Sequence, residues 1–169
     1  MADAEKPRRA AVVTISDGVV HGARKDTSGD AAQEILEAAG FVVVERTVVP
    51  DERTDIEGEL RRLVESGVAL VVTTGGTGFG PRDVTPEAAK AVIDREAPGL
   101  AELMRAAGLT KTPLAALSRG VAGAAGSSLI VNLPGSPKGV RESLEALAEV
   151  LPHATQLLAG DTEHSAPPG

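Results

Sequence analysis

Residues 71–87 read VVTTGGTGFGPRDVTPE, an apolar strand that runs into a glycine-rich turn and then into the start of a helix. Glycines let backbone N–H groups approach an oxyanion closely, and a following helix adds the positive end of its dipole. This order predicts an anion site and makes a phosphate-bearing substrate the first expectation. Glycines after a strand can also serve only to form the turn, so that alternative stays open here.

Two familiar nucleotide-binding motifs do not match this stretch. A Walker loop requires a Lys followed by Ser or Thr after its last glycine, and the sequence has neither. The dinucleotide fingerprint, counted from Gly76, meets Pro81 where Gly or Ala is needed. The turn is therefore neither of these two phosphate-binding loops.

Polar side chains follow the glycines within a few residues. Thr85 before Pro86 predicts a helix N-cap with proline at the first helical position. Arg82 can donate two parallel hydrogen bonds to phosphate oxygens, and Asp83 can hold a divalent cation that carries the phosphates. The alternative for Asp83 is a favourable charge at a helix N-terminus, worth about 0.3–1 kcal/mol.

Length and composition exclude several classes of protein. The 169 residues suit one domain, and the net charge of −7 with a pI near 5.0 argues against a nucleic-acid-binding scaffold. No cysteine is present, which excludes disulfides and Cys-based zinc sites, and the three histidines are far apart in sequence. No apolar run is long enough to span a membrane, and the charged residues 1–9 lack an apolar core of signal-peptide length, so we expect a cytoplasmic protein without membrane contact.

Apolar periodicity predicts strands alternating with helices. Strands are expected at 10–16, 41–49, 68–74 and 128–133, with a weaker one near 121–124, and amphipathic helices between them. The predicted fold class is α/β, a three-layer sandwich with a mostly parallel central sheet flanked by helices on both faces. We expect a flexible lead over 1–8, a single domain over 9–160 and a disordered tail over 161–169.

The carboxyl ends of the predicted strands carry most of the polar candidates. Those ends are Ser16-Asp17, Asp51-Glu52, residues 75–83 and residues 132–136, and in a parallel sheet they should converge on one edge. Carboxylates beside phosphate-binding turns suit metal-assisted phosphoryl or nucleotidyl transfer, which needs no covalent nucleophile. The residues alone thus indicate a metal-dependent phosphate chemistry.

The stretch TTGGTG followed by RDVTPE closely resembles the signature of the molybdenum cofactor biosynthesis family of MoaB and Mog proteins, to which the G domain of gephyrin is similar. The resemblance extends to Ser16-Asp17, 26–29, Pro50-Asp51 and 132–137. It implies an enzyme that uses Mg²⁺ and ATP to adenylylate molybdopterin, with release of pyrophosphate. It also implies a homo-oligomer, a trimer or a hexamer, and a molybdenum insertase as a partner.

The resemblance also assigns roles to individual residues. It implies Asp51 and Asp83 as the catalytic acids and as the metal-binding positions. It implies substrate or phosphate binding by Ser16, Asp17, Gly75, Gly76, Thr77, Gly78, Arg82, Thr85, Asn132, Pro134, Gly135 and Ser136. From the residues alone, Asp51 could be a solvated turn carboxylate, Asp17 could only shape its turn, and Asn132 could only tie adjacent loops together.

One loop departs from the family pattern. Residues 16–23 read SDGVVHGA, where Mog proteins more often carry an Arg and a second Ser after the first Asp, which favours the MoaB side of the family. Two other functions therefore stay open beside the adenylyltransferase. One is a catalytically silent molybdopterin-binding paralogue, and the other is a nucleotide pyrophosphatase of the CinA type.

Overall fold

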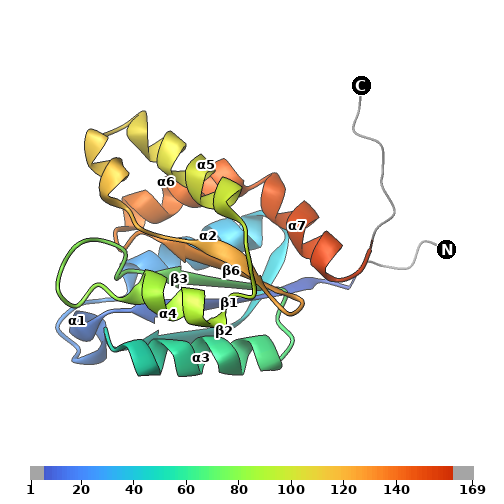
Figure 1. Ribbon diagram of the computed structural model, residues 1–169, viewed down its shortest axis with the longest axis horizontal. Helices are drawn as coiled ribbons and strands as arrows, with labels where there is room; N and C mark the ends of the chain where they lie inside the picture. The colour runs from blue at the N-terminus through green and yellow to red at the C-terminus, as the bar shows by residue number, and fades with distance from the viewer. Residues whose placement is uncertain (1–5, 162–169) are drawn as a thin grey trace.

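Six strands form a single sheet in the order β2-β1-β3-β6-β5-β4. Figure 1 shows this sheet with helices above and below it. The computed structural model describes residues 6–161. The strands are β1 (Arg8–Ile15), β2 (Phe41–Val49), β3 (Leu70–Thr74), β4 (Arg95–Glu96), β5 (Ala122–Ala125) and β6 (Ser128–Leu133). The first four in spatial order are parallel, and β5 and β4 add an antiparallel edge. The predicted mostly parallel sheet is confirmed.

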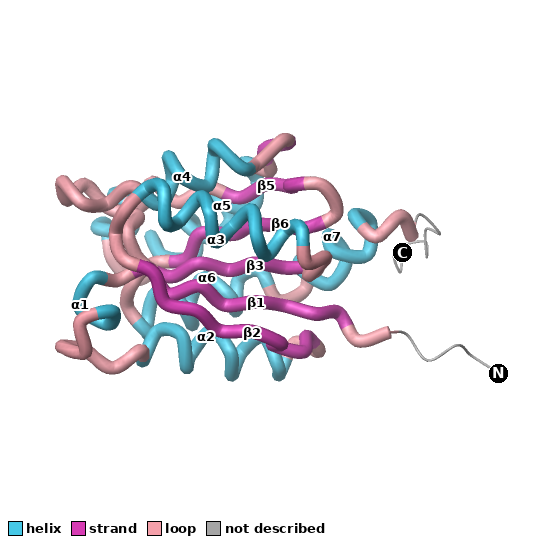
Figure 2. Tube along the Cα trace, turned by 90° about the horizontal axis from the view of Figure 1, so that it is seen from below, coloured by secondary structure: helices cyan, strands magenta, loops and turns pink. Residues whose placement is uncertain are grey.

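Helices cover both faces of this sheet, which confirms the predicted three layers (Figure 2). One face packs against α2 (Thr27–Ala38), α5 (Pro98–Leu109), α6 (Pro137–Leu147) and α7 (Val150–Leu158), and the other against α3 (Arg53–Glu65) and α4 (Thr85–Val92). Two short elements, α1 (Asp17–Val20) and the 3₁₀ helix η1 (Pro113–Leu117), complete the chain. The layers hold the strand ends in fixed relation to one another.

The apolar run of β1 explains its central place. Ala10 and Val12 face the α2 side, whereas Ala11, Val13 and Ile15 face the α3 side, and all five are buried. A strand buried on both faces needs a continuous apolar sequence. The edge strand β2 instead alternates, with Val42, Val44 and Val48 exposed.

Several local predictions were wrong. Residue 8 belongs to β1 and not to a flexible lead. The spacing of Val140, Leu144, Leu147 and Leu151 in the sequence predicts one continuous helix, but α6 ends at Leu147 and α7 starts at Val150. Pro152 explains the break, because its ring would clash with the carbonyl four residues earlier in a continuous helix.

The remaining differences concern helix starts and short elements. Thr54-Asp55 in the sequence predicts a helix cap, but α3 begins earlier, directly after Glu52. The short elements α1 and β4 were not predicted. The tail predicted for 161–169 and the first five residues of the lead lie outside the described residues, apart from Asp161. Within the described part of the chain, no helix is long and apolar enough to cross a membrane.

The described chain ends far from the carboxyl edge of the sheet. The start of β1 and the end of α7 lie at one end of the molecule, and α1 and the loop before α4 lie at the other (Figures 1 and 2).

Candidate functional site

The glycine-rich turn lies at the carboxyl end of β3 and needs glycine for its backbone. Gly75 and Gly76 have φ angles of 97° and 68°, which side-chain-bearing residues rarely adopt. A Cβ at Gly75 would lie 2.4 Å from the carbonyl oxygen of Ile15, and one at Gly76 would lie 2.2 Å from Thr85 Oγ1. The turn thus packs directly against its neighbours, so part of its glycine content is structural.

A second turn, at the end of β6, touches the first. A Cβ at Gly135 would lie 3.3 Å from Gly75 Cα, and the Gly75 N–H donates to the Leu133 carbonyl at 3.2 Å. Ser136 caps α6, because its Oγ accepts a hydrogen bond from the Gly139 N–H at 3.0 Å. The two turns predicted to bind substrate are therefore adjacent.

Asp17 and Asp51 join the ends of β1 and β2 by a reciprocal pair of hydrogen bonds. The Asp17 N–H donates to Asp51 Oδ2 and the Asp51 N–H donates to Asp17 Oδ1, both at 3.0 Å. Ser16 caps α1 beside them, accepting from the Val19 N–H at 3.2 Å. This arrangement leaves Asp51 Oδ1 facing the glycine turn, 3.3 Å from where a Gly76 Cβ would lie.

Arg82 is paired within the protein. Its Nε donates to Asp17 Oδ2 at 2.6 Å and its terminal nitrogen donates to Glu52 Oε1 at 2.9 Å. The hydrogen bond from Arg82 holds the pKa of the Asp17 carboxyl below its usual range. The side chain is 53% exposed but lines neither of the two cavities described below, so phosphate binding by Arg82 stays a prediction.

The two acidic residues predicted to be catalytic line the same cavity. Asp83 accepts a hydrogen bond from the Gly80 N–H through Oδ2 at 2.8 Å. Burial raises the pKa of Asp51, and the negative charges of Asp17 and Asp83 raise it further. A cation bound between Asp51 and Asp83 would reduce the repulsion between their carboxylates.

This cavity, which we name the polar cavity, has a volume of about 540 Å³. It is lined by the polar ends of several elements: Thr14, Ser16, Arg24, Lys25, Thr27, Ser28, Asp51, Thr74, Gly75, Gly76, Asp83, Gly135 and Ser136. The first residues of α2 and the cap of α6 are among them, so two helix N-termini meet here. Helix N-termini and backbone N–H groups favour anions.

A second cavity of about 360 Å³, which we name the apolar cavity, lies beside the polar cavity. Its wall contains Ala101, Met104, Leu114 and Leu117 from α5 and η1, and it also reaches Thr77, Gly78, Asn132 and Pro134. Ser136 lines both cavities. Most of the predicted site residues therefore line two adjoining cavities, whereas Asp17, Arg82 and Thr85 line neither.

Two predicted binding residues use their side chains inside the protein. Thr85 does not cap α4 as predicted: the cap is Val84, and Thr85 Oγ1 donates to the Gly75 carbonyl at 3.0 Å. Asn132 donates to Thr73 Oγ1 at 3.0 Å and accepts from the Val121 N–H at 3.1 Å. Asn132 thus ties strands together, and its role in binding substrate stays a prediction.

The carboxylates fit a cation that is held partly by substrate. Within residues 6–161 no group of three or more His, Asp or Glu side chains could hold a metal ion. Each of Asp51 and Asp83 has one oxygen, Oδ1, without a hydrogen bond to the described residues. Mg²⁺ usually binds through one or two carboxylates, several waters and substrate phosphates. Asp51 and Asp83 fit that donor set.

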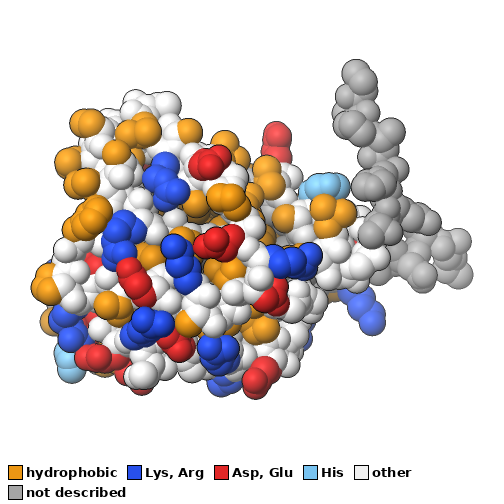
Figure 3. All heavy atoms as spheres, viewed as in Figure 1, with side chains coloured by type: hydrophobic (Ala, Val, Ile, Leu, Met, Phe, Trp, Pro, Cys, Tyr) orange, Lys and Arg blue, Asp and Glu red, His pale blue; other side chains and the backbone are white. Residues whose placement is uncertain are grey.

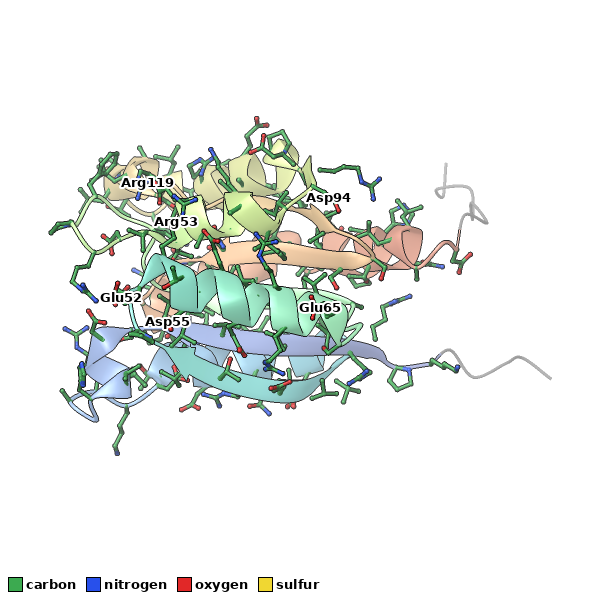
Figure 4. All side chains as sticks on the ribbon, turned by 60° about the horizontal axis from the view of Figure 1, so that its bottom comes forward. Glu52, Arg53, Asp55, Glu65, Asp94 and Arg119 are labelled. Carbon is green, nitrogen blue, oxygen red and sulfur yellow. The ribbon has the colours of Figure 1, made fainter. Side chains whose placement is uncertain are left out.

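Three cations near the site were not among the predicted site residues. Arg24 and Lys25 line the polar cavity, but they stand in a polar loop without a motif. Arg119, the third, donates to the carbonyls of Gly78 and Asp83. Figure 4 shows Arg119 and Glu52 toward the same end of the molecule, whereas Glu65 lies toward the other. Arg24, Lys25 and Arg119 are far in sequence from the glycine-rich turn or carry no motif, so the sequence did not show that they lie near it.

Comparison with known proteins places the chain in a family. Residues 11–153 match the family described as probable molybdopterin binding domain. A molybdopterin adenylyltransferase of Helicobacter pylori is 44% identical over 153 residues, which are 89% of this chain and 87% of that protein. The molybdenum cofactor synthesis protein cinnamon of Drosophila melanogaster is 42% identical over 152 residues, 89% of this chain but only 25% of that longer protein.

A solved structure is similar over most of its length. The molybdopterin biosynthesis enzyme MoaB of Thermus thermophilus is 54% identical, with a TM-score of 0.86 over 90% of this chain and 96% of that chain. The chain therefore belongs to the MoaB/Mog family of molybdenum cofactor biosynthesis proteins, within the probable molybdopterin binding domain family.

Proposed function

We propose that this protein is a molybdopterin adenylyltransferase that acts in molybdenum cofactor biosynthesis. One observation carries the proposal: the polar cavity joins Asp51 and Asp83 to a glycine turn, two helix N-termini and the cations Arg24 and Lys25. Such a site binds a chain of phosphates and neutralises its charge. The family and the adenylyltransferase relatives indicate which substrates to expect, namely ATP and molybdopterin.

The proposed reaction joins the phosphate of molybdopterin to the α-phosphate of ATP. A terminal phosphate oxygen of molybdopterin forms a bond to the α-phosphorus of ATP. The bond from that phosphorus to the bridging oxygen breaks, and its electron pair leaves with pyrophosphate. Ser136 lines both cavities. If each substrate occupies one cavity, their reacting phosphates meet beside Ser136.

The chain contributes mainly position and charge to this step. N–H groups of the turn after Gly75, whose own N–H is bonded to Leu133, contact phosphate oxygens, and Arg24 and Lys25 neutralise them. Mg²⁺, held by Asp51 and Asp83, would supply further neutralisation of the triphosphate. Arg82 stays paired with Asp17 and keeps the two strand ends in register.

The proposal extends to assembly and location. Leu109, Leu114 and Leu117 are exposed along α5 and η1, and Figure 3 shows hydrophobic side chains gathered in that region. Exposed apolar groups of this kind favour association with other subunits. We propose a homo-oligomer, a trimer or a hexamer, that works in the cytoplasm and passes its product to a molybdenum insertase.

The decisive experiment mixes the purified protein with MgATP and molybdopterin and follows pyrophosphate and adenylylated pterin. Both products should form only when both substrates are present. Pyrophosphate without pterin would indicate the CinA-type pyrophosphatase instead. Pterin binding without any turnover would indicate the silent paralogue.

A further inference from the structure

Arg119 stands between the apolar cavity and the loop that carries Asp83. It follows η1, and its neighbours Ser118 and Gly120 line the apolar cavity. Its own N–H donates to the Thr77 carbonyl at 2.9 Å. From α5, Arg105 donates to the carbonyls of Ser118 and Gly120 at 3.3 and 3.0 Å. The backbone of Arg119 is therefore anchored on both sides.

The Arg119 side chain spans the neck of the glycine-rich loop. Nε donates to the Gly78 carbonyl and a terminal nitrogen donates to the Asp83 carbonyl, both at 2.8 Å. The other terminal nitrogen contacts the Glu87 carboxylate at the start of α4, and the guanidinium lies 5.4 Å from the Phe79 ring centre. One planar group thus fixes both ends of the 79–82 tip.

Local bonds alone do not fix where that tip lies. The Asp83 N–H donates to the Gly80 carbonyl at 3.0 Å, and Asp83 Oδ2 accepts from the Gly80 N–H at 2.8 Å. These bonds hold the carboxylate to the tip itself. Arg82 also ties the tip to Asp17, but its side chain is 53% exposed, against 28% for Arg119. Arg119 is the more protected of the two anchors.

We propose that Arg119 is a positioning residue, which holds the Asp83 carboxylate and the Gly78 backbone in place for nucleotidyl transfer. The inference rests on the proposed function. Only arginine presents three N–H directions in a rigid plane, so a lysine cannot serve both carbonyls and Glu87 together. Displacement of reacting groups by about 1 Å can cost a hundredfold in rate.

The test compares Arg119→Lys and Arg119→Ala with the unmodified protein. We expect kcat to fall about tenfold to a hundredfold, while KM for ATP and for molybdopterin changes less than about threefold. Guanidinium at millimolar concentration should restore part of the kcat of Arg119→Ala and none of that of Asp83→Asn. Arg141→Ala is the matched control, because Arg141 only pairs with Glu34 on the surface.

A purely structural role gives a different result. Normal kcat in the folded fraction of both variants, together with a lower melting temperature, would overturn the proposal. A second measurement does not depend on turnover: amide hydrogen exchange at Gly80 and Asp83 should be at least about tenfold faster in both variants. If the unmodified protein fails to release pyrophosphate, the proposed function fails, and unchanged exchange in the variants separately rejects the role of Arg119.

Discussion

The Asp51 carboxyl combines partial burial with two negative neighbours. Its pKa is raised chiefly by burial and then by the charges of Asp17 and Asp83. Metal and phosphate organisation needs the carboxylate form, which is lost as the pH falls through this raised pKa. The acid limb of kcat/KM should therefore lie above the value near 3.9 of an unperturbed aspartic acid.

Removing the charge of Asp83 tests whether it contributes to the raised pKa of Asp51. In Asp83→Asn the acid limb should move to lower pH, because one of the charges that raise the pKa of Asp51 is gone. The pH dependence of residual pyrophosphate release measures the shift. An unchanged limb would mean that another group controls the acid side.

Asp83→Asn should also lower Mg²⁺-dependent turnover on the order of a hundredfold, with the fold and pterin binding retained, because transition-state charge is no longer organised. The matched control is Asp94→Asn. Asp94 also accepts a hydrogen bond from a glycine N–H at 2.8 Å, from Gly126, and it lines neither cavity. Its variant should keep full activity. Equal turnover in Asp83→Asn and the unmodified protein would remove Asp83 from the catalytic machinery.

Sequence analysis found the acidic residues but not all of the cations. Asp51 follows the end of β2 and Asp83 belongs to the long motif after β3, so their place beside one cavity could be predicted. The pairing of Arg82 with Asp17 spans 65 positions and could not. The same holds for Arg24 and Lys25, because only the packing of α1 and α2 brings their loop to the cavity.

Among the elements, the turn after β3 has the strictest requirement for glycine. Gly76→Ala places a Cβ 2.2 Å from Thr85 Oγ1 at a φ of 68°, which adds a clash to a left-handed cost of about 1–2 kcal/mol. We expect thermal unfolding to shift down by several degrees, at about 2–4 °C per kcal/mol. The loss would occur without any ligand.

Gly58→Ala is the control at the same scale. Gly58 lies inside α3 with nothing within 4 Å of a Cβ, so alanine should raise the free energy of unfolding by about 0.4–1 kcal/mol. Scanning calorimetry of both variants measures the difference. Equal stability of Gly76→Ala and Gly58→Ala would show that a Cβ at Gly76 does not clash. It also follows that a bulky residue at Gly76 is a poor probe of phosphate binding.

Elements with strong periodicity were predictable, and weakly marked ones were not. The buried apolar runs of β1, β3 and β6 indicated strands, and the glycines at 40 and 67 marked helix ends with positive φ. The two residues of β4 are exposed and carry no pattern. Their place depends on antiparallel pairing with β5, a tertiary contact that local sequence does not encode.

At the scale of the whole molecule, assembly can be tested through the α5–η1 surface. Sedimentation equilibrium should give a mass three or six times the chain mass of 17.2 kDa. Leu114→Glu, at a side chain that is 69% exposed, should lower that mass if this surface is the subunit contact, because a buried unpaired charge is costly. Val42→Glu on the exposed edge strand is the control and should leave the mass unchanged. A monomer in the unmodified protein would exclude the proposed oligomer.

The ends of the described chain lie opposite the carboxyl edge of the sheet, where both cavities are lined. A tag, a surface linker or a fused domain attached at either end would thus project away from the cavity mouths. The fold is suited to immobilisation and to modular fusion, since cargo can be added without blocking entry of small molecules.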